Sequence, residues 1–306
     1  MQQYILRRFI VAVPTVIGIT IVTFLLMYVL PGDPVEVMMG ERLDQQTMEM
    51  LRQQLGLDDP LPVRYLRFLG NAIRGDFGTS YQTRQPVRDM IAAAFPATLK
   101  LTALAYLISL IMGVFLGIHA AVHHNSWSDL GTMVFALIGM CAPSFMVALV
   151  LLYVFALRIP WFPLGGYGSF RYMILPAITL GIRPAAMLAR ITRSGMLEVL
   201  RQEYVRTARA KGLHERTVLM KHALKNCLIP VITVMGEQIS SLLGGSVLIE
   251  AIFAWPGMGK LSVEGINALD FPVVQGAVLV SAVVVVSLNL LVDLSYSLVN
   301  PRIRYE

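Results

Sequence analysis

Long apolar runs separated by short polar segments dominate this chain. A bilayer core about 30 Å thick needs about 20 apolar residues per helix. Six runs reach that length, at positions 9–30, 98–122, 130–157, 172–192, 228–253 and 271–299. The pattern therefore predicts an all-α, polytopic membrane protein with six transmembrane helices.

The first run needs to be distinguished from a secretory signal, because it follows Arg7 and Arg8. It is longer than the apolar region of a signal peptide, and it ends in LPGDP, which has no small-residue cleavage site. We therefore expect a retained membrane anchor.

The segment between the first two runs has helical periodicity of its own. Asp44 can cap a helix that Gly56 closes, with an apolar stripe at Met48, Leu51 and Leu55. A second helix can begin at Pro62. Its apolar residues are expected to face inward and are Val63, Leu66, Leu69 and Ile73. These signals predict a small helical cap, with a loose loop as the alternative.

The expected organisation has three parts. Residues 1–30 form the N-terminus and the first transmembrane helix, and residues 31–97 form the external helical cap. Residues 98–306 form a core of five transmembrane helices, which includes a cytoplasmic loop at 193–227.

Composition supports a membrane location. Of 306 residues, 56% are hydrophobic and 14% are charged, which is too apolar for a soluble domain. The net charge of +6 does not indicate nucleic acid, because the cations lie beside apolar runs instead of forming a soluble basic face. Cys141 and Cys227 have no CxxC spacing and are expected to be buried free thiols.

The distribution of cations predicts orientation. With a cytoplasmic N-terminus, the short outer loops contain only Arg158, Arg171 and Lys260. The inner side then receives Arg7, Arg8, Arg190, Arg193, Arg201, Arg206, Arg209, Lys211, Arg216, Lys221, Lys225, Arg302 and Arg304. Both termini are expected to be cytoplasmic.

The loop at 193–227 is the most informative segment. Its cations recur at helical spacing, Val199, Val205 and Ala208 form a modest apolar stripe, and Gly212 interrupts the helix. One interpretation is an interfacial amphipathic helix that attracts anionic lipid. The other is a surface that docks on a protein partner.

A family resemblance favours the protein partner. The string RTARAKGL resembles the EAA loop of ATP-binding-cassette (ABC) importer permeases, although Arg206 replaces the usual Glu and Lys225 replaces a frequent Pro. Most of the chain is similar to the first permease subunit of dipeptide and oligopeptide importers, through the motifs LRRF, LPGDPV, QQLGLDDPL, GDFGTSY, PATLKLT, MILPAITLG, TRSGMLEVL, YVRTARAKGL, KHALKNCLIPVITVMG, LLGGSVLIEAIFAWPGMGKL, DFPVVQG and NLLVDLSYSLVNPRIRY.

The resemblance implies a type I ABC importer permease fold in a bacterial cytoplasmic membrane. The implied partners are a second permease subunit, two cytoplasmic ATPase subunits and an extracytoplasmic substrate-binding protein. A coupling helix would dock on the ATPase through Glu203, Arg206, Thr207, Ala208, Arg209, Lys211 and Gly212. The outer loop at Trp255, Pro256 and Gly257 would help to form an external gate that meets the binding protein, with an interfacial aromatic anchor as the alternative role of Trp255.

Catalysis by this chain is not expected. No GxxxxGK[ST] phosphate loop occurs, since AWPGMGKL has Ala254 at the first Gly and Leu261 at the hydroxyl position. No catalytic Ser/His/Asp set or metal-ligand spacing is present, and His123 and His124 have no third ligand nearby. ATP and Mg²⁺ are expected on the ATPase subunits, with no cofactor on this chain.

Ionisable residues inside the predicted spans are candidates for the translocation path. Arg183, Glu237 and Asp293 would be costly in hydrocarbon and are expected to face a cavity or a partner. Arg183 and Glu237 can pair or line a polar path, or Glu237 can make an ordinary interhelical contact. Gly113 and Gly117 form a GxxxG packing motif.

The leading functional prediction is a permease subunit for small peptides. The same importer class also handles glutathione, nickel or metal chelates. A passive channel or ion-coupled transporter, and a membrane receptor or scaffold, are the other classes. The prolines Pro143, Pro176 and Pro184 can kink spans in any of these.

Overall fold

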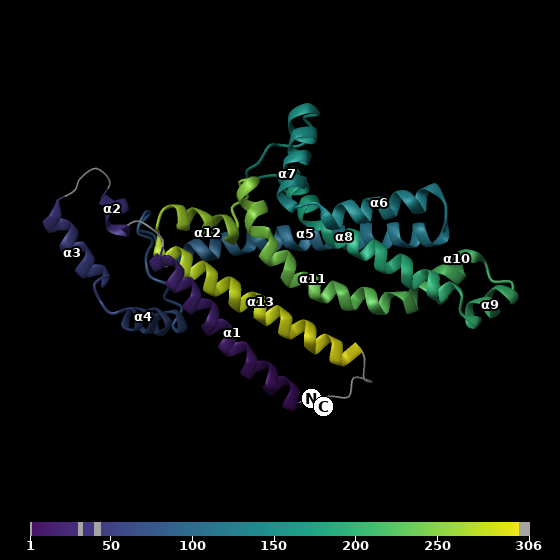
Figure 1. The fold of residues 1–306 in the computed structure, drawn as a ribbon, viewed down its shortest axis with the longest axis horizontal. Helices are drawn as coiled ribbons and strands as arrows, with labels where there is room; N and C mark the ends of the chain where they lie inside the picture. The colour runs from purple at the N-terminus through teal and green to yellow at the C-terminus, as the bar shows by residue number, and fades with distance from the viewer. Residues whose placement is uncertain (1, 30–32, 40–43, 300–306) are drawn as a thin grey trace. The chain divides into compact units, whose positions relative to one another are not determined.

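The computed structural model describes residues 2–29, 33–39 and 44–299, and regular structure in these residues is helical apart from one isolated bridge between Thr79 and Pro86 (Figure 1). The helices are α1 Gln2–Val29, α2 Pro34–Met39, α3 Gln45–Leu55, α4 Leu61–Ile73, α5 Val87–Val122, α6 Trp127–Cys141, α7 Ser144–Leu152, α8 Arg171–Leu200, α9 Glu203–Ala210, α10 Glu215–Thr217, α11 Leu224–Ile252, α12 Met258–Asn267 and α13 Phe271–Val299. Two π-helical turns, η1 Tyr153–Arg158 and η2 Val218–Ala223, extend α7 and precede α11.

Some expected features lie outside the described residues. These are residues 30–32 of the LPGDP motif and the cations Arg302 and Arg304. The same holds for the side chains of Arg7, Arg8 and Asp293.

The chain divides into two compact units. The first comprises Met1–Thr98 and Pro256–Glu306, and the second comprises Leu99–Trp255. In the first unit α1 and α13 lie side by side (Figure 1), and Met27 packs with Phe271 and Val274 in their shared core. The start of α5 packs against α12 and α13 in a second cluster, made of Val87, Ile91, Ala94, Met258, Val273 and Ala277.

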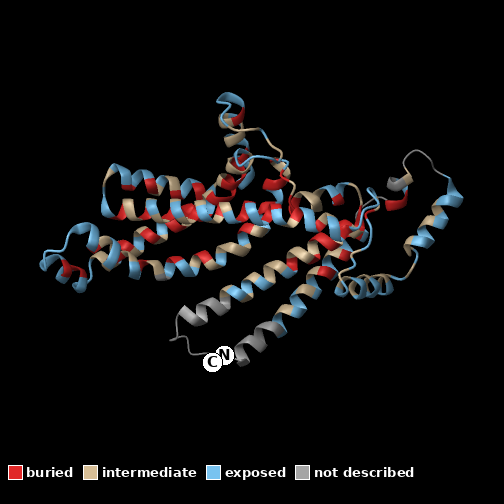
Figure 2. Ribbon diagram, turned by 180° about the vertical axis from the view of Figure 1, so that it is seen from behind, coloured by how far each residue is buried: buried red, intermediate tan, exposed pale blue. Residues whose placement is uncertain are grey.

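Helix α8 is the centre of the second unit. It packs against α6, α7 and α11 and buries residues along most of its length, from Leu175 to Met196 (Figure 2). The GxxxG prediction is confirmed, because a Cβ on Gly113 would lie 2.5 Å from the Leu188 Cβ. A Cβ on Gly117 would similarly lie 2.5 Å from the Thr192 Cβ. The two glycines therefore allow the backbones of α5 and α8 to approach closely.

Within the described residues, five helices are long and apolar enough to cross a membrane, and the sixth predicted span is different. The run at 130–157 does not form one helix, because the chain bends by 112° between α6 and the α7–η1 segment. Pro143 lies at the break and has no N–H to continue the helix. Ala142 before it is extended, with φ −68° and ψ 129°, as a residue preceding proline prefers.

Two predicted boundaries are also wrong. The second helix begins at Val87 and not at residue 98, and the fourth ends at Leu200 and not at residue 192. The apolar pattern marks the part of a helix suited to hydrocarbon. Hydrogen bonding continues the helix into its polar ends.

The two helices predicted between the first two spans are confirmed as α3 and α4, but the expected inward face of α4 is wrong. Neither helix buries a residue, and Val63, Leu66 and Ile73 are 46%, 66% and 81% exposed. Tyr65 faces α1 instead. Its hydroxyl lies 2.8 Å from the Thr20 Oγ1, and its ring meets the Phe24 ring edge-on at 5.6 Å. The contact of α4 with α1 is therefore made by the ring and hydroxyl of Tyr65, and not by the aliphatic stripe.

Candidate coupling site and translocation path

Helix α9 is a short helix directly after α8, and it packs against neighbouring parts of its own chain. Arg201 and Gln202 make the turn between them. Val205 is fully buried and Ala208 is 5% exposed, and both pack against Val218 with Val199 and Leu200 alongside. The predicted apolar stripe is confirmed, and it anchors α9 to its own chain.

The opposite face of α9 is polar and exposed. Glu203, Arg206, Thr207, Arg209 and Lys211 lie on it or next to it. The Arg206 Nη1 lies 2.9 Å from the Glu203 Oε1, and the Thr207 hydroxyl donates to the Glu203 carbonyl at 3.0 Å. Of the residues predicted to contact an ATPase, Ala208 alone is buried in the packing of this chain.

The turn after α9 is closed by an ion pair across a glycine. Gly212 has φ +76°, the left-handed conformation expected of it, and a Cβ there would meet nothing within 4 Å. Arg209 donates to both Glu215 oxygens, Nη2 to Oε1 at 2.7 Å and Nε to Oε2 at 3.1 Å. These hydrogen bonds hold the pKa of Glu215 below its usual value. The glycine is thus required by backbone conformation and not by close packing.

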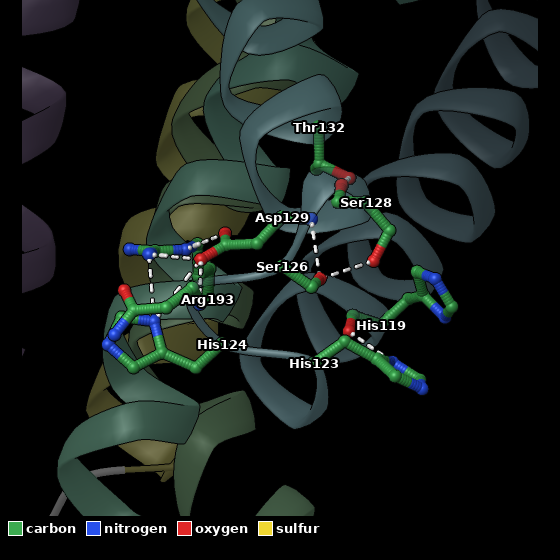
Figure 3. A network of polar contacts seen from close by, with 9 residues as sticks. His119, His123, His124, Ser126, Ser128, Asp129, Thr132 and Arg193 are labelled. Atoms are coloured by element: carbon green, nitrogen blue, oxygen red, sulfur yellow. Dashed lines mark hydrogen bonds and ion pairs between the residues drawn. The ribbon is translucent and has the colours of Figure 1, made fainter.

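A buried carboxylate fastens the far end of α8 to the turn between α5 and α6 (Figure 3). The Asp129 side chain is 5% exposed and accepts from the Arg193 Nε at 2.5 Å and from Nη2 at 2.8 Å. The His124 Nδ1 lies 3.2 Å from the same carboxylate, and the Asn125 N–H donates to it at 3.0 Å. We call Asp129, Arg193, His124 and Asn125 the Asp129 clamp. It ties α8 to α6 two turns before α8 ends.

Only half of this clamp has a local signal in the sequence. Ser126 caps α6 by accepting a hydrogen bond from the Asp129 N–H at 3.3 Å, which is the backbone half of a capping box. A Ser-x-x-Asp start therefore pointed to a helix terminus. The arginine that pairs with Asp129 lies 64 positions further on, and only the fold brings it there.

Arg183 lines a small cavity in the second unit. The cavity, of about 90 Å³, lies between the α6–α7 bend, α8 and α11, and its polar wall comes from Ser144, Thr179, Arg183, Gln238 and Ser241. Glu237 is exposed on α11 and is not part of that wall. Among the described residues, the side chains of Arg183 and Glu237 form no ion pair with each other. Their proposed roles in translocation remain predictions.

The loop at Trp255 is packed more tightly than expected. Trp255 is only 3% exposed, and its ring meets the Tyr167 ring edge-on at 4.9 Å. The Trp255 backbone N–H donates to the Glu250 carbonyl at 2.8 Å. An interfacial anchor role for Trp255 is therefore wrong for this chain, because intramolecular packing takes up the ring. A gate at Trp255, Pro256 and Gly257 stays a prediction.

Another buried carboxylate that sequence reasoning missed organises the first unit. Asp270 is 3% exposed and accepts hydrogen bonds from the Ser80 hydroxyl at 2.5 Å and the Tyr81 N–H at 3.1 Å. Burial raises the pKa of the neighbouring Tyr81 to about 12. The GDFGTSY and DFPVVQG motifs thus meet at one carboxylate.

Among the described residues, the cysteines form no disulfide and the histidines belong to no metal-ligand group. Both cysteines are free thiols, Cys227 buried as expected and Cys141 exposed against expectation. In the part of the chain that the structure describes, no group of three potential metal-ligating side chains occurs.

Comparison with known proteins decides the family. Residues 113–305 match the model of the binding-protein-dependent transport system inner membrane component, and residues 1–102 match the N-terminal model of the same type of component. The chain belongs to this family of ABC importer permeases. This permease is the membrane subunit of an importer, and ATP hydrolysis belongs to a separate subunit.

Curated relatives match over their whole length. The permease is 42% identical to the glutathione transport system permease protein GsiC of Escherichia coli strain K12, over 306 residues that cover all of both chains. The protein of the same name from Salmonella paratyphi A is also 42% identical, and that from Salmonella choleraesuis is 41% identical, again with full coverage.

A solved structure shows the same fold. The crystal structure of an amino acid ABC transporter with histidines matches 70% of this permease and 94% of its own chain, with a TM-score of 0.53 and 16% identity. At that identity the match carries the fold alone. It supports the type I permease architecture predicted from the sequence.

Proposed function

We propose that this permease is one of two transmembrane subunits of an ATP-driven importer for small peptides, with glutathione as its first candidate substrate. The observation that carries the substrate is the 42% identity to glutathione permeases across the full length of both chains. Glutathione is itself a tripeptide, so the peptide class predicted from the motifs includes it. Dipeptides and oligopeptides are the second candidates.

The proposed partners follow from the surfaces described above. Helix α9 presents a cationic, exposed face for an ATPase subunit, while its apolar face holds it on this chain. ATP and Mg²⁺ bind on two ATPase subunits in this scheme. A second permease subunit completes the path, and an extracytoplasmic binding protein delivers the solute.

Force on α9 is transmitted by rigid packing. Closure of the ATPase pair displaces α9, and α8 moves with it because only Arg201 and Gln202 separate the two helices. The Asp129 clamp and the Gly113 and Gly117 contacts carry that motion to α5 and α6. Nucleotide binding then shifts the population between outward-open and inward-open states.

The proposed orientation places α9 and both termini in the cytoplasm. The cations of the segment from α8 to α11 support it, because cytoplasmic loops carry an excess of Lys and Arg. The segment with α3 and α4 is then external.

Transport of labelled solute tests the substrate. The permease is co-expressed with its companion permease, ATPase subunits and binding protein, and the complex is reconstituted in proteoliposomes with ATP inside. We expect uptake of labelled glutathione that unlabelled dipeptides compete for weakly. Dipeptide uptake that glutathione does not inhibit would instead support the second candidate, and uptake of neither would contradict the peptide class.

A further inference from the structure

Arg183 is a cation without a partner in an apolar helix. It lies 12 residues after the start of α8, about 18 Å along a helix that rises 1.5 Å per residue. Its side chain is exposed on this chain, and within the described residues it has no hydrogen bond or ion pair. A guanidinium at this depth is costly in hydrocarbon, so water or an anion must face it in the assembled importer.

The cavity beside Arg183 has a mainly apolar lining with a few neutral polar side chains and no carboxylate. The wall of its 90 Å³ cavity carries the hydroxyls of Ser144, Thr179 and Ser241 and the amide of Gln238, and no Asp or Glu. Pro184 also lines the cavity and has no N–H, so the Leu180 carbonyl lacks the donor four residues on. The cavity therefore has one fixed positive charge and several neutral hydrogen-bonding groups.

This combination suits one end of a peptide. A guanidinium binds a carboxylate through two parallel hydrogen bonds, which neutral amides and esters cannot reproduce. The cavity is far smaller than a typical pocket for a whole ligand of several hundred Å³. It can therefore take a carboxylate with its adjoining atoms while the rest of the solute remains in the path.

We propose that Arg183 is a specificity-determining residue of the translocation path that binds the C-terminal carboxylate of a peptide substrate, with Gln238 and Ser241 orienting it. This inference rests on the proposed peptide-import function. Glu237 is not the partner of Arg183 in this arrangement, because it lies outside the cavity wall.

Selectivity between two forms of one substrate tests the proposal. The complete importer is reconstituted with wild-type permease, Arg183→Gln or Arg183→Lys, and maximal uptake rates are measured for glutathione and for glutathione amidated at its glycine carboxylate. The binding protein is the same throughout and is held saturated with each solute. A change in the ratio of the two rates therefore arises in the membrane subunits.

We expect Arg183→Gln to lower the ratio of glutathione to amide uptake about tenfold, the equivalent of one charge-assisted hydrogen-bonded contact. Arg183→Lys keeps the positive charge but cannot donate two parallel hydrogen bonds. Its uptake ratio should therefore fall between those of the wild type and Arg183→Gln. The matched control is Arg190→Gln, which removes another exposed cation two turns further along α8, and its ratio should equal that of the wild type.

An unchanged ratio in Arg183→Gln, with transport retained, would overturn the proposal and assign Arg183 to a structural pair with the companion subunit. If that variant does not assemble, judged by ATPase activity stimulated by the binding protein, an unchanged ratio in Arg183→Lys overturns it equally. Wild-type importer that transports neither form would contradict the proposed substrate and not the role of Arg183.

Discussion

At the scale of single residues, Asp129 is the polar group on which the coupling region depends most. Its carboxylate is buried, and it accepts two hydrogen bonds from Arg193 and one from the Asn125 N–H. Removing one partner of such a pair leaves the other charge without compensation. Its loss is therefore more serious than the loss of any exposed ion pair.

We predict that Asp129→Asn destabilises the permease by about 2–3 kcal/mol, because Arg193 keeps its charge and loses its anion. Thermal unfolding of the purified complex in detergent measures this as a lower Tm. The matched control is Asp59→Asn, which removes the exposed partner of Arg67 and should change stability by less than about 0.5 kcal/mol. Equal effects of the two substitutions would contradict the clamp.

Gly212 provides a second prediction at this scale. With φ at +76°, Gly212→Ala forces a side chain into the left-handed region at a cost of about 1 kcal/mol. The turn between α9 and α10 should shift, so ATP hydrolysis continues while solute uptake per ATP falls. The ratio of uptake to phosphate release in proteoliposomes measures this. Lys211→Ala is the control, because it keeps the glycine. A Gly212→Ala ratio equal to that of the wild type would contradict a role of this turn in coupling.

The left-handed glycines could be predicted from the sequence, and the partners of buried side chains could not. Gly56 and Gly212 each follow a helical pattern, and a glycine there is a local signal. The pairing of Asp129 with Arg193 depends on the fold. So does the burial of Trp255, because an aromatic residue beside a membrane boundary suits an interface and a core equally well.

Among the helices, α5 and α8 pack most closely where Gly113 and Gly117 face α8. We predict that Gly113→Ala destabilises the complex by about 1–3 kcal/mol, because its Cβ would lie 2.5 Å from the Leu188 Cβ and 2.8 Å from the Ala185 carbonyl oxygen. Gly131→Ala in α6 is the matched control. It has open space around it and should be neutral or slightly stabilising, since alanine favours a helix. Comparable Tm losses in both variants would show that the α5–α8 contact is not tight.

The turn that follows α9 should be insensitive to pH near neutrality. Glu215 has a lowered pKa in the folded state, so its pairing with Arg209 is complete above the unfolded value of about 4.3 and is lost as the pH falls through the lower folded value. Both side chains are about half exposed, so the pair contributes less than about 1 kcal/mol. Uptake per ATP should therefore be unchanged between pH 8 and pH 6 in wild type and in Glu215→Gln alike. A change confined to the wild type in that range would contradict the assignment.

Apolar runs predicted which segments can cross the membrane but not how each one is built. Pro143 breaks one run into two helices that meet at 112°, and the same residue type at Pro176 and Pro184 leaves α8 continuous. Pro176 and Pro184 are buried in α8, while Pro143 is exposed. Single-sequence patterns do not contain that information.

At the scale of the whole molecule, the family and the fold were accessible from the sequence because many motifs recur in one order along the chain. The number of apolar runs fixed the class, and the charges of the loop gave an orientation. The division into two units was not accessible, because it joins residues before Thr98 to residues after Trp255. The cavity beside Arg183 was hidden for the same reason, as its wall comes from α6, α7, α8 and α11.

We propose that this permease moves solute only when an ATPase acts on α9. The most direct measurement is ATP-dependent uptake of glutathione in proteoliposomes that contain both permease subunits and the binding protein, with and without the ATPase subunits. We expect uptake with the ATPase and ATP, and none when either is omitted. Equal uptake by the permease subunits alone would contradict it and establish a passive or ion-coupled transporter.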